Sequence, residues 1–440
     1  MTEIENLRRE LREGIRAPRD AAERALAHAN SNAGRNVYLS LDQEWALREA
    51  EELPRRFGAA SERPLLYGLP VSLKDCFDLG GFKTTDGTRF YAQRNAPAAN
   101  DSAVASRLRA EGAVIVGKTH VHPLTFGITG ENPDYGDCAQ PKRPECLTGG
   151  STSGGAASVQ EGSAVAAIGT DTGGSIRVPS ALCGLAGYRA SIELAHERKL
   201  WGGGIRLAPS FDTLGWIYSD LCDGPLLAEA LFGIPRKEAS DNALRRQLCI
   251  GVVGEKFLDD CEAQVLDVFR TWQQRLRAAG AELTDIDVDW WNDAMRIFAP
   301  IQAHEAAAIH APATGGDFSV FEPSIAERLA WGASIAPAKI VVARHRHDVF
   351  RAQVDAILDE HDYLILPCAP STCLKVGADH SQTRSVILRY TVPMSLAGTP
   401  VVTLPSDIGA GVQLVAARGA DARLLAFSAQ LGVASAGRTS

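Results

Sequence analysis

Residues 169–180 of the chain read GTDTGGSIRVPS, a stretch in which two glycines directly precede Ser175. The surrounding segment 146–190 is rich in glycine and serine, but apolar runs such as AVAAIG and IRVPSALCGLAGY interleave with these residues. Glycine lets backbone segments approach one another closely, whereas a flexible linker would be polar throughout. We therefore interpret 146–190 as the tightly packed centre of the fold.

Apolar runs and helical runs alternate outward from this centre. GLPVSLKD (68–75) and AVIVGKT (113–119) have the composition of buried strands. Between them DSAVASRLRAEG (101–112) has one apolar face and ends in glycine, as a helix does. This alternation is typical of a parallel or mixed sheet covered by helices, so the sequence predicts a single large α/β/α domain.

The remaining elements follow from the same patterns. Residues 3–30 have helical periodicity with a break at Pro18, and 289–360 are mostly helical, with the basic run 344–347 expected on a solvated helix face. A polar surface connection is expected over 236–247. The later strands are expected at LCIGVV, AELTDIDV, YLILPCAP, TPVVTLPS and GVQLVAA, and the later helices at 259–279 and DARLLAFSAQLG.

Composition narrows the kind of protein. The formal net charge of -8 over 440 residues gives no electrostatic reason to expect nucleic acid or an anionic membrane as a partner. The nine cysteines are scattered without a C-x-x-C pair, which predicts neither a disulfide framework nor a zinc site. The charged N-terminus is not a signal peptide, and the apolar runs are shorter than the ~18 residues of a membrane span. We expect a reduced, soluble, cytoplasmic protein.

Ser175 is a candidate nucleophile, because the glycines before it let backbone N–H groups face one point and stabilise an oxyanion there. Taken alone, a glycine turn that ends in serine is more often structural. A nucleophilic serine needs a base, and none of the ten histidines has a decisive context. His120 and His122 form an H-x-H pair, but the acidic or cysteine partners of a metal site are not evident.

Two other stretches offer a base and a relay. Lys74 ends the buried strand of GLPVSLKD; it is either a surface strand end or a desolvated amine, whose lowered pKa would let it act as a base. Ser151 and Ser153 lie between the glycine pairs of GGSTSGG, where a serine can pass a proton between two groups. The chain lacks the second D-[ST]-G of an aspartic protease, a phosphate-binding G-x-x-x-x-G-K-[ST] and a G-x-S-x-G elbow.

GLPVSLKD, GGSTSGGAASV and GTDTGGSIRVPS, in this order, resemble the signature regions of the amidase signature family. SRLRAEGAVIVGKT, FGITGENPDYG, SLAGTPVVTLP and GVQLVAARGADARLLA match as well, so the resemblance is strong over 65–215 and returns over 362–432. The family's catalytic lysine, cis-serine bridge and nucleophilic serine fall on Lys74, Ser151 and Ser175. Ser151 has the family's usual spacing of 24 residues before Ser175, but the family often reads GGSSGGS, so Ser153 is the rival for the bridge.

The resemblance implies an amidase that hydrolyses a carbon–nitrogen bond of a small molecule through an acyl-enzyme on Ser175, with Lys74 and Ser151 as the proton relay. Asp171 and Arg177 are interpreted as structural residues that orient the loop. No cofactor and no metal are expected. The oxyanion would be held by backbone N–H groups, those of Thr172, Gly173, Gly174 and Ser175.

The implied fold is a single domain over 1–440 with a mixed, twisted central sheet. Its parts are a helical N-terminal cap (1–60), the signature core (65–215), a more variable, mostly helical region (240–360), and returning core strands with a closing helix (362–432). Pocket walls are expected from 120–140, 200–215 and 300–390. Aromatic candidates for the lining, each more often a core residue, are Trp201, Phe211, Trp331 and Tyr390.

The substrate remains open. Simple amides, carbamate- or urea-like compounds such as carboxybiuret or allophanate, and glutamine all fit the chemistry, the last for the glutamine-hydrolysing component of a tRNA-dependent amidotransferase. Those components typically carry an acidic residue where ILRYTVP has Leu388, which disfavours that role. An inactive binding protein of this family is disfavoured because all three catalytic residue types are present. The expected partner is a small-molecule amide, not nucleic acid or membrane, and a homodimer is left open because relatives are often dimers.

Overall fold

The chain is described by a computed structural model over residues 1–31, 35–58, 63–236 and 247–436. The polar connection expected over 236–247 lies almost wholly outside these residues. The described residues form a mixed sheet of eleven strands, in the order β1, β3, β2, β5, β7, β6, β12, β13, β10, β8, β9. The strands are β1 Tyr38–Ser40, β2 Pro70–Lys74, β3 Val114–Thr119, β5 Ala166–Asp171, β6 Ala186–Arg189, β7 Thr213–Tyr218, β8 Cys249–Val253, β9 Glu282–Ile286, β10 Tyr363–Pro367, β12 Val401–Leu404 and β13 Val412–Val415.

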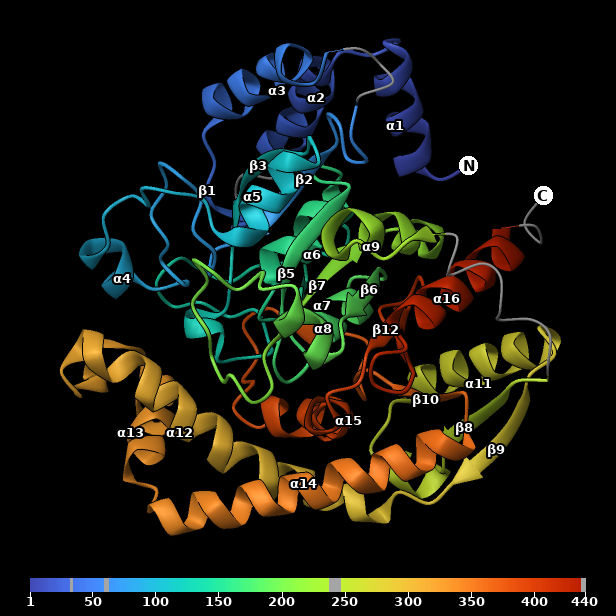
Figure 1. Cartoon of the computed structure of the whole chain (residues 1–440). Coiled ribbons are helices and arrows are strands. Elements are labelled where there is room, and N and C mark those ends of the chain that lie inside the picture. Colours follow the sequence, from blue (N-terminus) through green and yellow to red (C-terminus); the bar gives the residue numbers. More distant parts are fainter. Residues whose placement is uncertain (32–34, 59–62, 237–246, 437–440) are drawn as a thin grey trace.

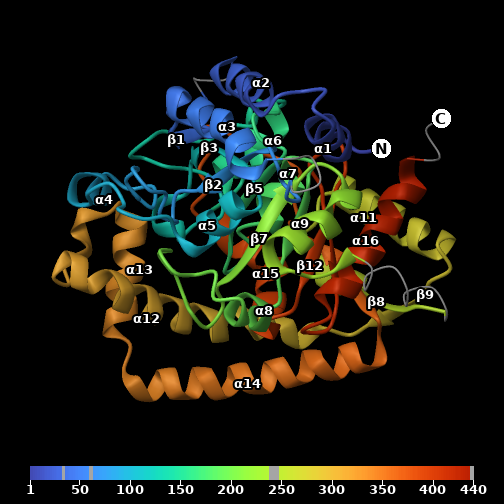
Figure 2. The same cartoon turned by 45° about the horizontal axis from the view of Figure 1, so that its top comes forward.

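Helices surround this sheet and make the predicted α/β/α arrangement (Figure 1). The N-terminal helices α1 to α3 cover one end of the molecule, and α12 to α14 lie at the opposite end in both views (Figure 1 and Figure 2). The helices are α1 Glu3–Glu13, α2 Pro18–Ser31, α3 Gln43–Phe57, α4 Arg89–Arg94, α5 Ala103–Ala110, α6 Ser153–Glu161, α7 Arg177–Leu182, α8 Ile192–Glu197, α9 Gly224–Phe232, α11 Ala263–Ala278, α12 Ala294–Thr314, α13 Pro323–Ser334, α14 Pro337–Glu360, α15 Thr383–Ala397 and α16 Asp421–Ala436.

Local chemistry explains where these elements begin and end. Thr2 and Glu5 form a capping box at the start of α1, and Gly14 ends that helix in the left-handed conformation. The central strands β2, β3 and β5 are buried along their whole length, as parallel strands covered on both faces are. The strands and helices expected from the apolar runs are therefore confirmed.

The basic run 344–347 lies on α14, but its prediction is wrong for one residue. Arg344 and Arg346 point to solvent and form ion pairs with Glu305 and Asp293. His347 is buried, and its Nε2 lies 2.7 Å from the carbonyl oxygen of Leu396. The helical repeat places His347 on the buried stripe of α14, so charge patterning alone misplaces it.

The expectation that the cysteines form no disulfide is wrong for one pair. Cys146 and Cys373 are bonded, although 227 residues separate them. They meet because the short strands β4 Cys146–Leu147 and β11 Leu374–Lys375 pair with one another, a contact that cysteine spacing does not reveal. Four other cysteines are buried small residues, as expected: Cys76, Cys138, Cys183 and Cys368.

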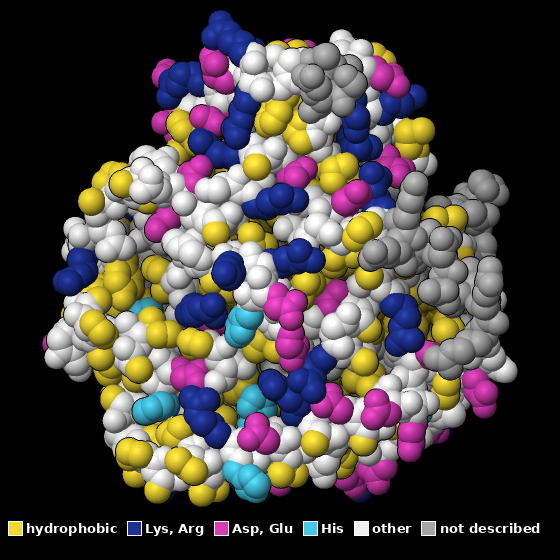
Figure 3. Space-filling model, in the orientation of Figure 1, with side chains coloured by type: hydrophobic (Ala, Val, Ile, Leu, Met, Phe, Trp, Pro, Cys, Tyr) yellow, Lys and Arg dark blue, Asp and Glu magenta, His cyan; other side chains and the backbone are white. Residues whose placement is uncertain are grey.

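The surface seen in Figure 3 carries basic and acidic side chains interspersed with one another. Across the part of the chain that the structure describes, no helix is both long and apolar enough to cross a membrane.

Candidate active site

Lys74 is the last residue of β2, an inner strand of the sheet, and lies on the side of the sheet where β5 also has its carboxyl-terminal end. β2 and β5 are parallel neighbours with Leu73 opposite Ile168, so their carboxyl ends lie side by side. Ligand-binding sites of α/β proteins commonly lie at the carboxyl-terminal ends of the strands. Lys74 Nζ donates to Ser151 Oγ at 2.8 Å and to Thr170 Oγ1 at 2.8 Å. The fold thus joins the candidate lysine to the first serine of GGSTSGG, which follows a cis peptide bond.

Ser153, the rival serine, has a different partner. It is the first residue of α6, and its Oγ lies 2.8 Å from His120 Nδ1. His120 Nε2 lies 2.9 Å from the carbonyl oxygen of Gly136 and must donate to it, so Nδ1 is the acceptor for the Ser153 hydroxyl. Burial lowers the pKa of His120 to about 4, in keeping with this neutral ring. The structure places Ser153 against His120 and Ser151 against Lys74.

Lys74 is fully buried, and this burial lowers the pKa of its amine below the ordinary value. The nearby Cys76, Asp86 and Asp171 oppose that shift without reversing it. Within the described part of the chain, Nζ has hydroxyl and carbonyl oxygens as partners and no carboxylate in an ion pair. A lysine in these surroundings releases its proton more easily than one at a surface.

Asp86 is a buried acid near Lys74 that the sequence reasoning missed. Its backbone N–H donates to the carbonyl oxygen of Asp75 at 3.1 Å, which holds it beside the end of β2. Neither carboxylate oxygen has a hydrogen-bond partner among the described residues. Burial raises the pKa of Asp86 to about 8, with Lys74 as the main opposing charge. Burial thus favours the protonated form of Asp86 more than in an exposed aspartate. The sequence signal was an acid in the otherwise uncharged loop TTDGT.

Ser175 lies in the tight turn between β5 and α7. Gly174 before it has a φ of +131°, and a Cβ there would lie 2.8 Å from Thr391 Oγ1, so this position requires glycine. The Ser175 carbonyl oxygen accepts a hydrogen bond from the N–H of Thr152 at 3.2 Å. Since Thr152 follows Ser151, this bond places the segment of Ser151 directly against Ser175.

Asp171 and Arg177 hold the turn from behind, in the structural role expected for them. Asp171 Oδ1 lies 2.8 Å from Arg177 Nη2 and 3.1 Å from Arg189 Nη1, and all three side chains are fully buried. Burial alone would raise the pKa of Asp171, but the two guanidinium groups outweigh it and hold the pKa well below the usual range. Asp171 also accepts from the N–H of Ile176 at 3.1 Å, which fixes the start of α7.

The backbone N–H groups of the turn differ in whether they already have a hydrogen-bond acceptor. Gly174 N–H donates to Asp171 Oδ1 at 2.9 Å. The hydrogen bonds found among the described residues include none from the N–H groups of Thr172, Gly173 or Ser175. Three of the four expected oxyanion donors are thus free for a ligand, and the fourth is occupied by the carboxylate behind the turn.

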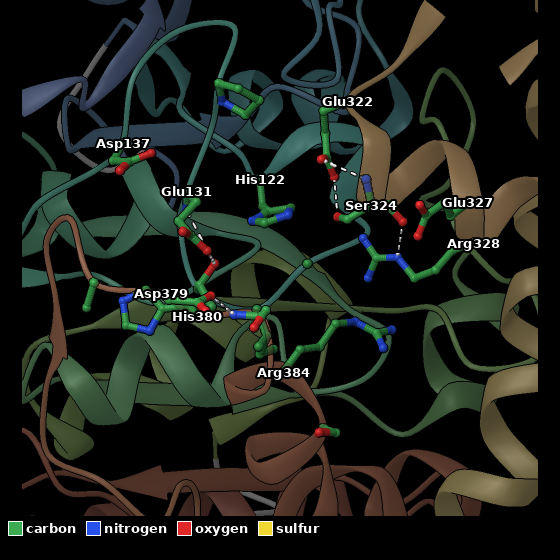
Figure 4. A pocket seen from close by; sticks show the side chains of 17 residues that line it. His122, Glu131, Asp137, Glu322, Ser324, Glu327, Arg328, Asp379, His380 and Arg384 are labelled. Carbon is green, nitrogen blue, oxygen red and sulfur yellow. Dashed lines mark hydrogen bonds between the residues drawn. The ribbon is translucent and has the colours of Figure 1, made fainter. Parts of the chain in front are cut away.

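Ser175 opens onto a narrow pocket of about 10 Å³, room for roughly one water molecule. An outer cavity of about 620 Å³ adjoins it, and Gly127, Ile128 and Arg384 line both (Figure 4). The walls come from all three expected regions. The narrow pocket is lined by Thr125, Phe126, Gly127, Ile128, Thr172, Gly173, Ser175, Leu207, Gln302, Arg384 and Leu388.

The aromatic candidates do not line these two spaces. Trp201, Phe211 and Tyr390 are core residues, and Trp331 is exposed on α13. Sequence reasoning instead missed Arg328 and Arg384, which line the outer cavity from α13 and α15. Nothing in the local sequence distinguishes these two arginines from those at the surface.

Comparison with known proteins defines the class. A solved structure of an amidase has a TM-score of 0.88 and 29% identity, covering 98% of this chain and 100% of that one. A structure described as a vestigial complex revealing the origins of an s-triazine catabolic enzyme has a TM-score of 0.85 and 26% identity, covering 97% and 98%. The A subunit of the glutamyl-tRNA(Gln) amidotransferase of Synechococcus sp. (strain WH7803) is 28% identical, over 94% of this chain and 93% of that protein.

The protein is thus an enzyme of the class that hydrolyses carbon–nitrogen bonds other than peptide bonds. The amidase family model matches residues 20–425, and the chain belongs to this family, with the fold of the amidase signature enzymes.

Proposed function

We propose that the protein hydrolyses an amide-type bond of a small molecule, with Ser175 as the nucleophile and Ser151 and Lys74 as the proton relay. The observation that carries the proposal is the 2.8 Å contact between Lys74 Nζ and Ser151 Oγ in a fully buried setting. A buried amine with a lowered pKa is a base, and a hydroxyl beside it can transmit a proton.

The relay accounts for each proton in the reaction. Ser175 Oγ attacks the substrate carbonyl carbon, its proton moves to Ser151 Oγ, and the Ser151 proton moves to neutral Lys74. Lys74 then returns a proton through Ser151 to the leaving nitrogen, so that the carbon–nitrogen bond breaks and an acyl ester remains on Ser175. A water molecule attacks this ester, gives its proton to the same relay, and regenerates the Ser175 hydroxyl as the acid departs.

The negative oxygen formed in each attack needs donors aimed at it. We assign this role to the N–H groups of Thr172, Gly173 and Ser175, which have no acceptor within the described residues. Gly174, the fourth candidate, donates to Asp171 and acts by shaping the turn. This division gives the two glycines different tasks: one supplies a donor, and the other supplies a backbone conformation.

Hydrolysis of glutamine within an amidotransferase is the second candidate, supported by the 28% identity to the amidotransferase component of Synechococcus sp. (strain WH7803). Leu388 opposes this role, because it lines the narrow pocket beside Ser175 where those components typically have an acid. A carbamate or urea substrate stays a further candidate; the chain is 26% identical to a complex that is described as revealing the origins of an s-triazine catabolic enzyme. An inactive binding protein is disfavoured by the contact between Lys74 and Ser151.

We infer that residues 65–215 supply the reacting groups and one wall of the outer cavity, whereas 240–360 and 362–432 supply the facing wall that helps to select the substrate. Arg328 and Arg384 illustrate this division, because each lines the outer cavity from outside the signature core. The whole chain 1–440 would then act as one unit. A cytoplasmic location and a homodimer stay predictions.

The test is release of ammonia or amine from a panel of small amides, carbamates, ureas and glutamine. Ser175→Ala should reduce release by at least about 10³-fold, since the nucleophile is gone. Ser334→Ala is the matched control, because Ser334 is exposed at the end of α13 and should leave the rate unchanged. Release that survives in Ser175→Ala would refute the assignment of the nucleophile.

A further inference from the structure

Two arginines lie next to the pocket of Ser175. Arg384, in the first turn of α15, lines both the narrow pocket and the outer cavity, and Arg328 on α13 lines the outer cavity. Both guanidinium groups lie over the ring of Phe126, at 4.4 Å for Arg328 and 5.6 Å for Arg384. Figure 4 shows them on the same side of the cavity, with Glu131, Asp137 and Asp379 on the other side.

Neither guanidinium is neutralised by an ion pair within the described residues. Arg384 Nη2 donates to the neutral amide oxygen of Gln302 at 3.0 Å, and Arg328 Nε donates to the carbonyl oxygen of Ser324 at 3.1 Å. Burial, together with the smaller effect of the charge of Arg328, lowers the pKa of Arg384 to about 9. Burial also lowers the pKa of Arg328 to about 10, against the influence of Glu322. Two like charges are therefore held together in a partly desolvated place.

Five acids line the cavity, and among the described residues all of them except Glu327 accept hydrogen bonds from neighbouring groups: Glu131, Asp137, Glu322 and Asp379. Glu322 accepts from the N–H groups of Ser324 and Ile325 and so caps α13. Glu131 accepts from Thr129 Oγ1 at 2.7 Å, and Asp379 accepts from the N–H of Ser381 at 2.8 Å. In the described ranges no carboxylate forms an ion pair with Arg328 or Arg384, although other arginines of the molecule are paired.

Arg389, further along the same helix as Arg384, makes the contrast clear. It forms ion pairs with Asp259 at 3.0 Å and Asp260 at 2.9 Å. Cations near a protein surface are normally satisfied in this way, whereas unpaired buried charge costs free energy. Two neighbouring guanidinium groups without ion-pair partners favour the binding of an anion, because the anion supplies the negative charge that the protein does not.

The geometry also limits the distance from the anion to the reacting carbon. The space beside Ser175 has room for about one water molecule, so only a compact group fits there. Arg384 lines this space and the larger cavity alike, so an anion on its guanidinium lies only a few atoms from the scissile carbonyl. The acids on the opposite wall disfavour a multiply charged group such as phosphate.

We propose that the substrate is a short amide or urea bearing a carboxylate, which Arg384 and Arg328 bind while Ser175 attacks the carbonyl. This inference rests on the proposed hydrolytic function and names its substrate class. Arg384 is the principal contact, because it alone of the two reaches the pocket of Ser175. Arg328 contributes from the outer side of Phe126 and keeps the carboxylate oriented.

The experiment compares kcat/KM for oxamate, malonamate and succinamate with kcat/KM for propionamide and butyramide. The wild type should prefer the acids, and Arg384→Gln should lower the ratio of acid to neutral amide by about 10- to 100-fold, the loss of a charge-assisted hydrogen bond. Arg384→Lys should recover part of the ratio, because it restores the charge without the fork. Arg389→Gln is the control on the same helix and should keep the ratio within about threefold.

Calorimetric binding of malonate, with inorganic phosphate as the competing probe, separates this inference from the hydrolytic function. Malonate binding that is lost in Arg384→Gln supports the anion site, whether or not any amide is hydrolysed. Absence of hydrolysis of every amide would refute the proposed hydrolytic function and leave the anion site standing. Hydrolysis that depends on Ser175 but is equally fast for acids and neutral amides overturns the inference and leaves the function standing. Tighter binding of phosphate than of malonate overturns the choice of carboxylate.

Discussion

Replacing Asp171 by asparagine tests whether the charge behind the turn of Ser175 stabilises the fold. Asp171 is fully buried and pairs with Arg177 at 2.8 Å and Arg189 at 3.1 Å. The asparagine side chain would keep the size of the native one but leave two buried guanidinium groups without an anion. Removing one partner of a buried pair costs about 3–5 kcal/mol, against a total stability of about 5–15 kcal/mol for typical proteins.

The assay is equilibrium unfolding in urea, followed by circular dichroism. For a long chain with an m value of about 3–4 kcal/mol/M, we expect the midpoint of Asp171→Asn to fall by about 1 M. Asp293→Asn is the matched control, because Asp293 also contacts two arginines, Arg296 and Arg346, but at the surface. Its loss should stay below about 1 kcal/mol.

The pH dependence gives a second measurement of the same interaction. The pKa of Asp171 is lowered in the folded protein from its ordinary value of 3.8, because the two guanidinium groups outweigh burial. Its contribution to stability is therefore fully present above that value and is lost as the pH falls below it. The unfolding free energy of Asp171→Asn should not show this loss as the pH falls. An unfolding free energy within about 1 kcal/mol of wild type would refute the reasoning.

Three further predictions concern the turn and the relay. With a neutral amide as substrate, kcat/KM should rise with pH, and the midpoint of the rise should lie below the ordinary lysine pKa of 10.5, because the pKa of Lys74 is lowered and its neutral form is the base. Lys74→Met should lose this rise. A midpoint at or above 10.5 would contradict the assignment. Ser151→Ala should reduce kcat by about 10²-fold or more and Ser153→Ala by far less; the reverse order would show that the bridge is misassigned. Gly174→Ala should destabilise the protein by about 1–3 kcal/mol more than Gly280→Ala in urea unfolding, since both have positive φ but only Gly174 lacks space for a methyl group; equal losses would mean that the neighbouring side chain yields.

Local stretches of sequence were enough to predict the secondary-structure elements and the candidate reactive side chains. The apolar run of GLPVSLKD predicted β2, and the lysine at its end was a candidate for a desolvated amine, because both depend on residues adjacent in the chain. The two glycines before Ser175 likewise predicted a tight turn, in which Gly174 has a positive φ. The resemblance to the amidase signature family rested on the same local stretches, and the match over residues 20–425 confirms it.

Which of these groups meet depends on contacts between distant parts of the chain. The spacing to Ser175 favoured Ser151 over Ser153, but only the tertiary structure shows that Ser151 lies against Lys74 and Ser153 against His120. The bond between Cys146 and Cys373 depends on a strand pair whose members are 227 residues apart.

Arg384 is the sharpest case. In the sequence it does not differ from Arg389, which is paired at the surface of the same helix. Its position on the helix turns it toward Gln302 and the pocket of Ser175, away from any acid that could neutralise it among the described residues. Local patterns fix backbone conformation because they act over a few residues, whereas burial and ion pairing depend on which distant segments the fold brings alongside.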